Sequence, residues 1–226
     1  DSCVPVKNEV KKFDFAMNED GGSSFSQTIG GIEFRRLDSF GNILWLLRLT
    51  DEGVSVHCLD YTRWHQVWPQ ARELMLNVLF VVPVGTALSG IGLKYVDRFR
   101  YTGNEEDYAI DGFFQTPNSY LSNRCFTAGF QWHCHTGWFG KVRSANEQPS
   151  NGLLERCLNQ LNITSNKEVS PAGTGIFITI DHNLLVNTLS IDDMKLSVEN
   201  DPWFDNLMNA LHLSLIHISE PTRPRL

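Results

Sequence analysis

The residues best suited to bind a metal ion are two histidines that flank a cysteine, in the run His133-Cys134-His135. In an extended strand, residues two apart lie on the same face, so His133 and His135 could ligate one ion while Cys134 points away. A third ligand would have to come from a distant residue such as His57 or His182. The pattern therefore leaves two interpretations: a surface strand, which is the simpler one, and a metal-dependent hydrolase that uses His133 and His135.

Three basic residues, Lys94, Arg98 and Arg100, lie at alternate positions of a segment that reads as a strand, residues 91–101. Alternation places them with Val96 on one face. A basic stripe in an acidic chain could receive an anionic ligand or partner. Ion pairing with the many carboxylates of the chain is the competing interpretation.

Asp97 lies on the opposite, apolar face of the same segment and is the one residue there, tyrosines aside, that can ionise. A buried carboxylate is costly unless it is paired or hydrogen-bonded. We therefore expect a local partner for Asp97, either backbone N–H groups or an arginine of a neighbouring strand. Its role would then be structural.

Other kinds of chemistry have less support. The sequence contains no nucleophile elbow and no phosphate-binding glycine motif, and the acidic runs at 105–107 and 192–193 read as solvated turns. The number of cysteines is odd and no C-x-x-C pair occurs, which favours a reducing cytoplasm over a disulfide framework. The cysteines are Cys3, Cys58, Cys125, Cys134 and Cys157.

Composition limits the partners. The 226 residues carry a formal net charge of −7, and an acidic chain argues against bulk nucleic-acid binding. The longest apolar stretch, residues 74–84, is too short to span a bilayer. We therefore expect no membrane or nucleic-acid partner and no cofactor, and a protein or a small anionic ligand as the partner.

Two groups of elements must position these residues. Three short β-rich runs joined by glycine-containing turns predict antiparallel hairpins, preceded by a loop at 18–26. Apolar residues at spacings of three and four then predict a helix over 63–82, with Thr62 as its N-cap and Pro69 either kinking it or lying in its first turn. The three runs are 32–37, 43–49 and 54–59.

The second group repeats this order of strands and then a helix. Further strands are expected at 90–101, 125–139, 157–164 and 173–180, and a last helix opens at Asp201-Pro202. The pattern predicts an α+β fold in which antiparallel sheet packs against two main helices. The two halves could be a diverged duplication, although the sequence shows no self-similarity.

The run Ile91-Gly-Leu-Lys-Tyr-Val-Asp-Arg98 resembles the Ile-Gly-Leu-Arg-Tyr-Ile-Asn-Arg strand of a sporadically distributed family of bacterial and archaeal conserved hypothetical proteins, about 250 residues long. Trp64 and the segment 176–181 are similar to further motifs of that family. The resemblance implies structural roles for Trp64 and Tyr95. It implies no activity, because the family has none assigned.

The last fourteen residues, 213–226, resemble the in-frame translation of a sequencing adapter. That resemblance implies a non-native tail that is peripheral to the fold, although 213–218 could extend the last helix. We expect one α+β domain over residues 1–212, truncated at both ends, because the first residue is also Asp1 rather than Met. We interpret this domain as a cytoplasmic binding protein without enzymatic activity.

Overall fold

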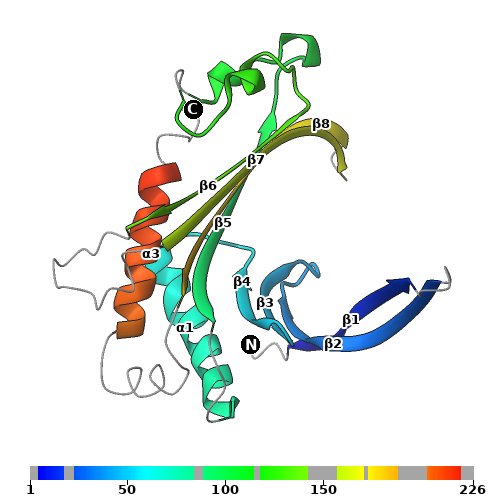
Figure 1. The fold of residues 1–226 in the computed structure, drawn as a ribbon, viewed down its shortest axis with the longest axis vertical. Helices are drawn as coiled ribbons and strands as arrows, with labels where there is room; N and C mark the ends of the chain where they lie inside the picture. Colours follow the sequence, from blue (N-terminus) through cyan, green and yellow to red (C-terminus); the bar gives the residue numbers. More distant parts are fainter. Residues whose placement is uncertain are drawn as a thin grey trace. The chain divides into compact units, whose positions relative to one another are not determined.

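The computed structural model describes residues 5–17, 23–83, 89–114, 118–141, 157–170, 173–187 and 203–219 (Figure 1). The chain divides into two compact units, Asp1–Pro83 and Val84–Leu226, and each is described by itself. The single domain over 1–212 stays a prediction.

The first unit is a four-stranded antiparallel meander followed by a helix. The strand order in the sheet is β1-β2-β3-β4, so each strand pairs with its neighbour in the sequence. Tight turns at residues 38–42 and 50–53 close the last two hairpins, as their glycines predict. The elements are β1 (Val6–Met17), β2 (Ser23–Leu37), β3 (Ile43–Thr50), β4 (Gly53–Cys58) and α1 (Trp64–Val81).

One face of this sheet lies against α1. Arg36 of β2 donates a hydrogen bond from Nη2 to Oε1 of Gln70 in α1, at 3.4 Å, and its guanidinium lies 5.9 Å from the ring centre of Trp45. Trp45 is Arg36's partner in the β2–β3 register and is buried. Partners in an antiparallel pair share a face, so the other face of the sheet is turned away from α1.

The sequence did not predict β1. Its residues alternate irregularly between lysines and apolar side chains, and the pairing with β2 contains a bulge between Val10 and Lys11. The expected loop at 18–26 is wrong for Ser23–Ser26, which belong to β2, while 18–22 lie outside the described residues. The long pairing with β1 holds Ser23–Ser26 in extended form.

The predicted helix is confirmed as α1, but the details of its start differ. Arg63 occupies the N-cap position without a side-chain bond, and Thr62 instead donates from Oγ1 to Oε1 of Gln66 at 2.8 Å. The helix begins at Trp64, so Pro69 lies inside it rather than in its first turn. Trp64 and Trp68 lie one turn apart in this first part of α1, and their rings stack with centres 5.1 Å apart.

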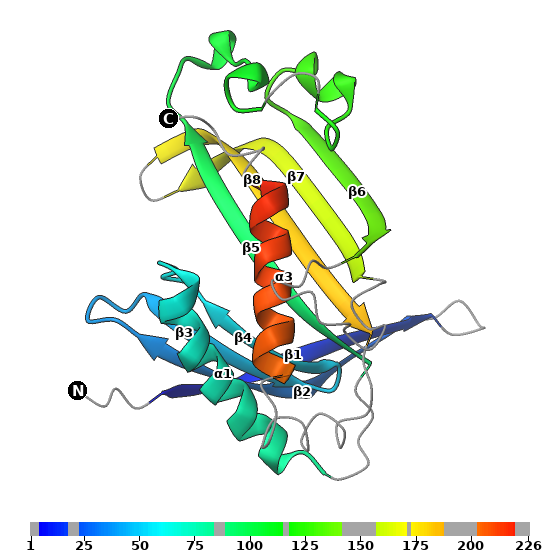
Figure 2. The same ribbon diagram turned by 90° about the vertical axis from the view of Figure 1, so that its left-hand side faces the viewer.

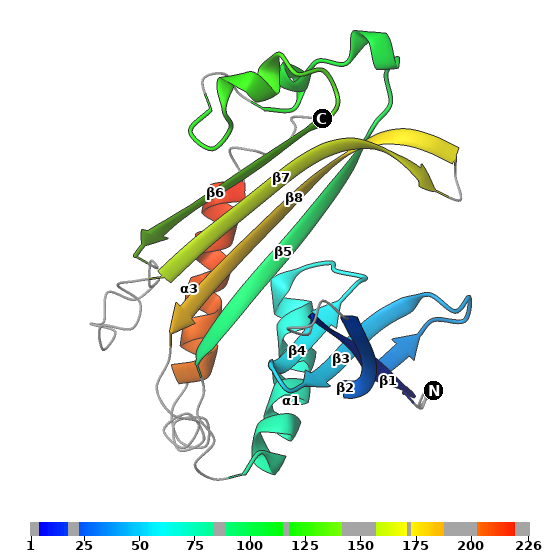
Figure 3. The ribbon, with the colours of Figure 1, turned by 45° about the vertical axis from the view of Figure 1, so that its right-hand side comes forward.

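The second unit is also a four-stranded antiparallel sheet, with the order β5-β8-β7-β6 (Figure 3). Three 3₁₀ turns are described between β5 and β6, and a helix follows the sheet. The expected strand at 125–139 divides into a 3₁₀ turn and β6. The elements are β5 (Gly90–Tyr101), η1 (Glu105–Asp107), η2 (Ile110–Gly112), η3 (Asn123–Phe126), β6 (Trp132–Gly140), β7 (Cys157–Ser170), β8 (Gly173–Asn187) and α3 (Trp203–Ser219).

The helix α3 and the segment of 3₁₀ turns both pack on one face of this sheet. Tyr95 of β5 is hydrogen-bonded to His212 of α3, and Tyr95 pairs with His182 of β8. His182 alternates with Ile180, whose side chain belongs to the cluster under the 3₁₀ turns. Figure 2 shows α3 lying across the strands. The buried members of that cluster are Ile110, Phe114, Leu121, Cys125, Leu161, Ile163, Ile178 and Ile180.

In the part of the chain that the structure describes, two antiparallel sheets and two α-helices confirm the coarse prediction of an α+β fold. The strand orders of the two units differ, because β5 pairs with β8 where a repeat of the first unit would pair it with β6. The topology therefore gives no support to a simple duplication.

The expectation of a peripheral tail is wrong for the first residues after His212. The helix α3 continues to Ser219, and Leu215 is completely buried together with Leu211 one turn earlier. Their spacing of four residues places both on the face that packs on the sheet. Residues 220–226 lie outside the described part of the chain.

Candidate functional site

The open face of the second sheet carries the basic residues that the sequence singled out. Along β5, residues alternate between exposed and partly buried, and Lys94, Arg98 and Arg100 all lie on the exposed side, as predicted. Because α3 and the 3₁₀ turns occupy the opposite face, these side chains extend from the face that this unit leaves open.

Two of the three basic residues are neutralised by carboxylates of neighbouring strands. Lys94 pairs with Asp181 of β8, with Nζ 2.7 Å from Oδ2. Arg98 pairs with Glu168 of β7, and its guanidinium also lies 4.0 Å from the ring centre of Phe177. For Lys94 and Arg98, the structure therefore shows ion pairing with carboxylates of the chain, which was the alternative to ligand binding.

Arg100 differs from its two neighbours. It makes no ion pair and no side-chain hydrogen bond with any residue that the structure describes. Its guanidinium lies directly over Gly175 of β8: a Cβ added to that glycine would be 2.9 Å from Nε. The missing side chain at Gly175 leaves room for Arg100 to lie against the sheet.

A hollow of about 570 Å³ lies beside Arg100, at the end of β5 and at the β7–β8 hairpin. Lys167 lines it from β7, and its Nζ donates to Oε2 of Glu105 at 2.5 Å. Tyr101 lines it too, fixed by a hydrogen bond from its hydroxyl to the carbonyl oxygen of Asp107 at 3.0 Å. The hollow thus combines a guanidinium without a partner among the described residues, the Lys167–Glu105 ion pair and a tyrosine.

Sequence reasoning had missed most of this hollow. Glu105 was interpreted as part of a solvated turn, and neither Lys167 nor Gly175 was singled out. Lys167 and Gly175 are more than sixty positions away from Arg100 and Glu105 in the sequence. Only the pairing of β5, β8 and β7 brings them together. No spacing in the sequence could have indicated it.

The two histidines of β6 share a face, as predicted, and both are exposed. Their ring centres are 6.5 Å apart at an interplanar angle of 71°. Across the strand pair, His133 faces Thr164 and His135 faces Asn162, neither of which is a zinc ligand of choice. In the described residues no group of three possible ligands occurs.

His182, one of the residues considered as a third ligand, lies on the covered face of the sheet. It is 2% exposed, and within the described residues neither ring nitrogen has a hydrogen-bond partner. Burial lowers the pKa of His182 to about 4, with Asp181 opposing the shift weakly. The ring is therefore neutral at physiological pH. It lies beside Trp138, with ring centres 6.3 Å apart.

Asp97 is partly buried on the covered face, as the alternation predicts. The local partner expected for its carboxylate is not found among the described residues. Tyr95, two positions earlier, has its hydroxyl oxygen 2.8 Å from Nδ1 of His212. That bond ties β5 to α3, which agrees with the structural role expected for Tyr95.

The thiols of Cys125 and Cys157 are held protonated. Burial raises the pKa of Cys157 to about 11 and raises the pKa of Cys125 as well. A thiol must ionise to act as a nucleophile, so neither cysteine is activated for covalent catalysis.

Comparison of the chain with protein-family models, with curated proteins and with solved structures found no match. The family that the strand motif at 91–98 resembles therefore stays a prediction. Among the described helices, none is long and apolar enough to cross a membrane.

Proposed function

We propose that this chain is a binding protein for a small anionic ligand, and that Arg100 is the residue that receives the anionic group. The observation that carries the proposal is the difference among the cations of one sheet. Lys94, Arg98 and Lys167 each have a carboxylate partner, whereas Arg100 has none among the described residues.

The surroundings of Arg100 support a ligand of modest size. A volume of about 570 Å³ lies within the usual range for small-molecule sites, which is about 300–1,000 Å³. A guanidinium binds a carboxylate or phosphate through two parallel hydrogen bonds. A small organic acid or a phosphate ester would suit such a guanidinium, and Tyr101 lines the same hollow.

In the described lining of the hollow, the acid–base side chains Glu105 and Lys167 pair with each other, which supports binding rather than chemistry. The hydrolase alternative rests on His133 and His135 alone and gains no third ligand from the described residues. A reducing cytoplasm stays part of the proposal, and the free thiols of Cys58, Cys125, Cys134 and Cys157 support it.

The test is titration of the folded chain with benzoate and with phenyl phosphate, followed by two-dimensional amide NMR. We expect saturable shifts at residues 100–103 and 174–176. Arg100→Gln should weaken the affinity by about tenfold or more, since a guanidinium–anion pair contributes about 1.5–3 kcal/mol.

Arg98→Gln is the matched control, because it removes the same charge from the same face of β5 only two residues away. It should leave the affinity within about twofold, because Arg98 already pairs with Glu168. An Arg100→Gln variant that binds as the wild type does, or an equal loss in both variants, would refute the proposal.

A further inference from the structure

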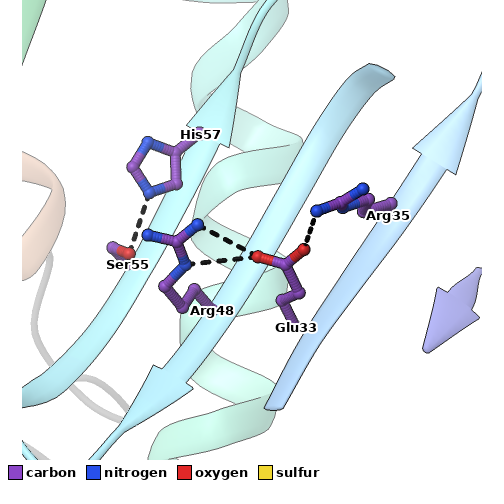
Figure 4. Close-up of polar contacts among 5 residues, drawn as sticks. All are labelled: Glu33, Arg35, Arg48, Ser55 and His57. Carbon is purple, nitrogen blue, oxygen red and sulfur yellow. Dashed lines mark hydrogen bonds and ion pairs between the residues drawn. The ribbon is translucent and has the colours of Figure 1, made fainter. Parts of the chain in front are cut away.

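A second charged cluster lies in the first unit, on the sheet face turned away from α1. Glu33 of β2 pairs with Arg48 of β3, and Arg48 pairs in turn with Ser55 of β4. Arg35 and His57 lie on the same face, two residues further along their strands. Figure 4 shows these five side chains together.

The cluster contains more donors than acceptors. Arg48 donates from Nε and Nη2 to Oε2 of Glu33, at 3.3 and 3.0 Å, and Arg35 pairs with Oε1 of the same carboxylate. Two guanidinium groups therefore share one carboxylate, which leaves one positive charge in excess. Nη1 of Arg48 makes no hydrogen bond with a described residue, and Nε of Arg35 is buried without one.

The carboxylate is internal to the cluster and the cations are external. The side chain of Glu33 is 5% exposed, whereas those of Arg35 and Arg48 are 40% and 43% exposed. Desolvation tends to raise the pKa of Glu33, but hydrogen bonds from Arg48 and Arg35 outweigh it and the pKa lies below its ordinary value. Glu33 is therefore an ionised anchor that fixes both guanidinium groups and is itself covered.

The edge strand adds two further groups beside Arg48. Ser55 lies directly opposite Arg48, and side chains opposite each other have Cβ atoms about 5 Å apart. The Ser55 hydroxyl oxygen is 2.9 Å from Nε2 of His57. In Figure 4 the Arg48 guanidinium lies between Glu33 and this serine–histidine pair.

We infer that this face of the first unit binds a phosphoryl group, with Arg48 as the main cation and the Ser55 hydroxyl, held by His57, as a further donor. A phosphoryl group has three terminal oxygens and close to two negative charges at neutral pH, so it can use donors that converge from several side chains. A guanidinium fixed by a carboxylate is pre-organised for such a group, because little side-chain freedom is lost on binding.

The test uses the whole chain with Arg100→Gln in the background, so that the hollow of the second unit does not contribute. Inorganic phosphate and O-phosphoserine are titrated separately at low salt, and binding is followed through the amide signals of residues 48, 55 and 57. We expect saturable binding with a dissociation constant at or below the order of 1 mM. Tighter binding of O-phosphoserine points to an organic ester, and equal affinities point to free phosphate; both outcomes support the site.

Substitutions separate this site from general charge effects. Arg48→Gln should weaken binding by about tenfold or more, and Ser55→Ala by a smaller factor of about three to ten. Arg36→Gln is the matched control, since it removes the same charge from β2 on the opposite face. Absence of saturable binding, an unchanged affinity in Ser55→Ala, or an equal loss in Arg36→Gln would overturn the inference. Ser55→Ala keeps the test decisive if Arg48→Gln does not fold.

Discussion

Acid should destabilise the second unit through His182. The ring is buried beside Trp138 with no partner for either nitrogen among the described residues, and burial lowers its pKa from 6.5 to about 4. The unfolded chain therefore binds a proton near pH 6.5, whereas the folded unit binds it only near pH 4. Between those values the unfolded state holds more protons, so stability falls as the pH falls.

The size of the effect follows from the two pKa values. Each pKa unit corresponds to about 1.4 kcal/mol, so His182 should account for a loss of about 3 kcal/mol between about pH 6.5 and pH 4. Above about pH 6.5 the ring is neutral in the folded and the unfolded state, so His182 causes no such loss there. That loss is a large fraction of the roughly 5–15 kcal/mol by which domains are stable.

The assay is urea unfolding of the wild type and of His182→Leu at pH 7.5, 6.0 and 4.5. At pH 7.5 the variant should be as stable as the wild type or more stable, because leucine removes two unpartnered nitrogens at similar volume. Its advantage should then grow by about 2–3 kcal/mol toward pH 4.5. His135→Leu, at an exposed position of the same sheet, should show no such growth. If His182→Leu and the wild type lose stability in parallel, the proton is bound elsewhere and the reasoning is wrong.

Three further predictions concern the tail, zinc and Asp97. Leu215→Ala should cost about 2–5 kcal/mol of unfolding free energy, because Leu215 is fully buried against the sheet; a cost below about 0.5 kcal/mol would show that residues 213–219 are peripheral after all. Elemental analysis of the purified protein should find no stoichiometric zinc, and one zinc per chain that His133→Ala removes would contradict this and favour the hydrolase. Asp97→Ala should cost less than about 1 kcal/mol, since no bond to its carboxylate is found among the described residues, and a loss of 1–3 kcal/mol in urea unfolding would reveal a partner.

The alternation of side chains gave the strongest sequence prediction. In β5, Lys94, Arg98 and Arg100 alternate with residues of a mainly apolar face, and the structure places all three on the open face as expected. The amphipathic pattern located α1 to within one residue at each end. Both patterns are local, so a single segment contains all the information they need.

The rest depends on contacts between distant segments. Nothing in the sequence near Arg100 indicates that Gly175 and Lys167 lie beside it, because strand register decides that. Strand β1 lacks a regular alternation and owes its extended form to pairing with β2. The burial of Leu215 could not be predicted from the resemblance of residues 213–226 to an adapter sequence. Packing depends on which face of the helix a residue occupies, and not on the origin of the residue.

In the second unit, α3 and the 3₁₀ turns cover only one face of the sheet. Substitutions on the covered face and on the open face should therefore have different effects. Side chains under α3 and the 3₁₀ turns are constrained by packing, so a change there alters the folding free energy. Lys94, Arg98 and Arg100 extend from the other face, where the packed core imposes no shape on them. Their identities can therefore drift during evolution at little cost in stability, and the ligand preference of this face can change while the scaffold beneath it stays the same.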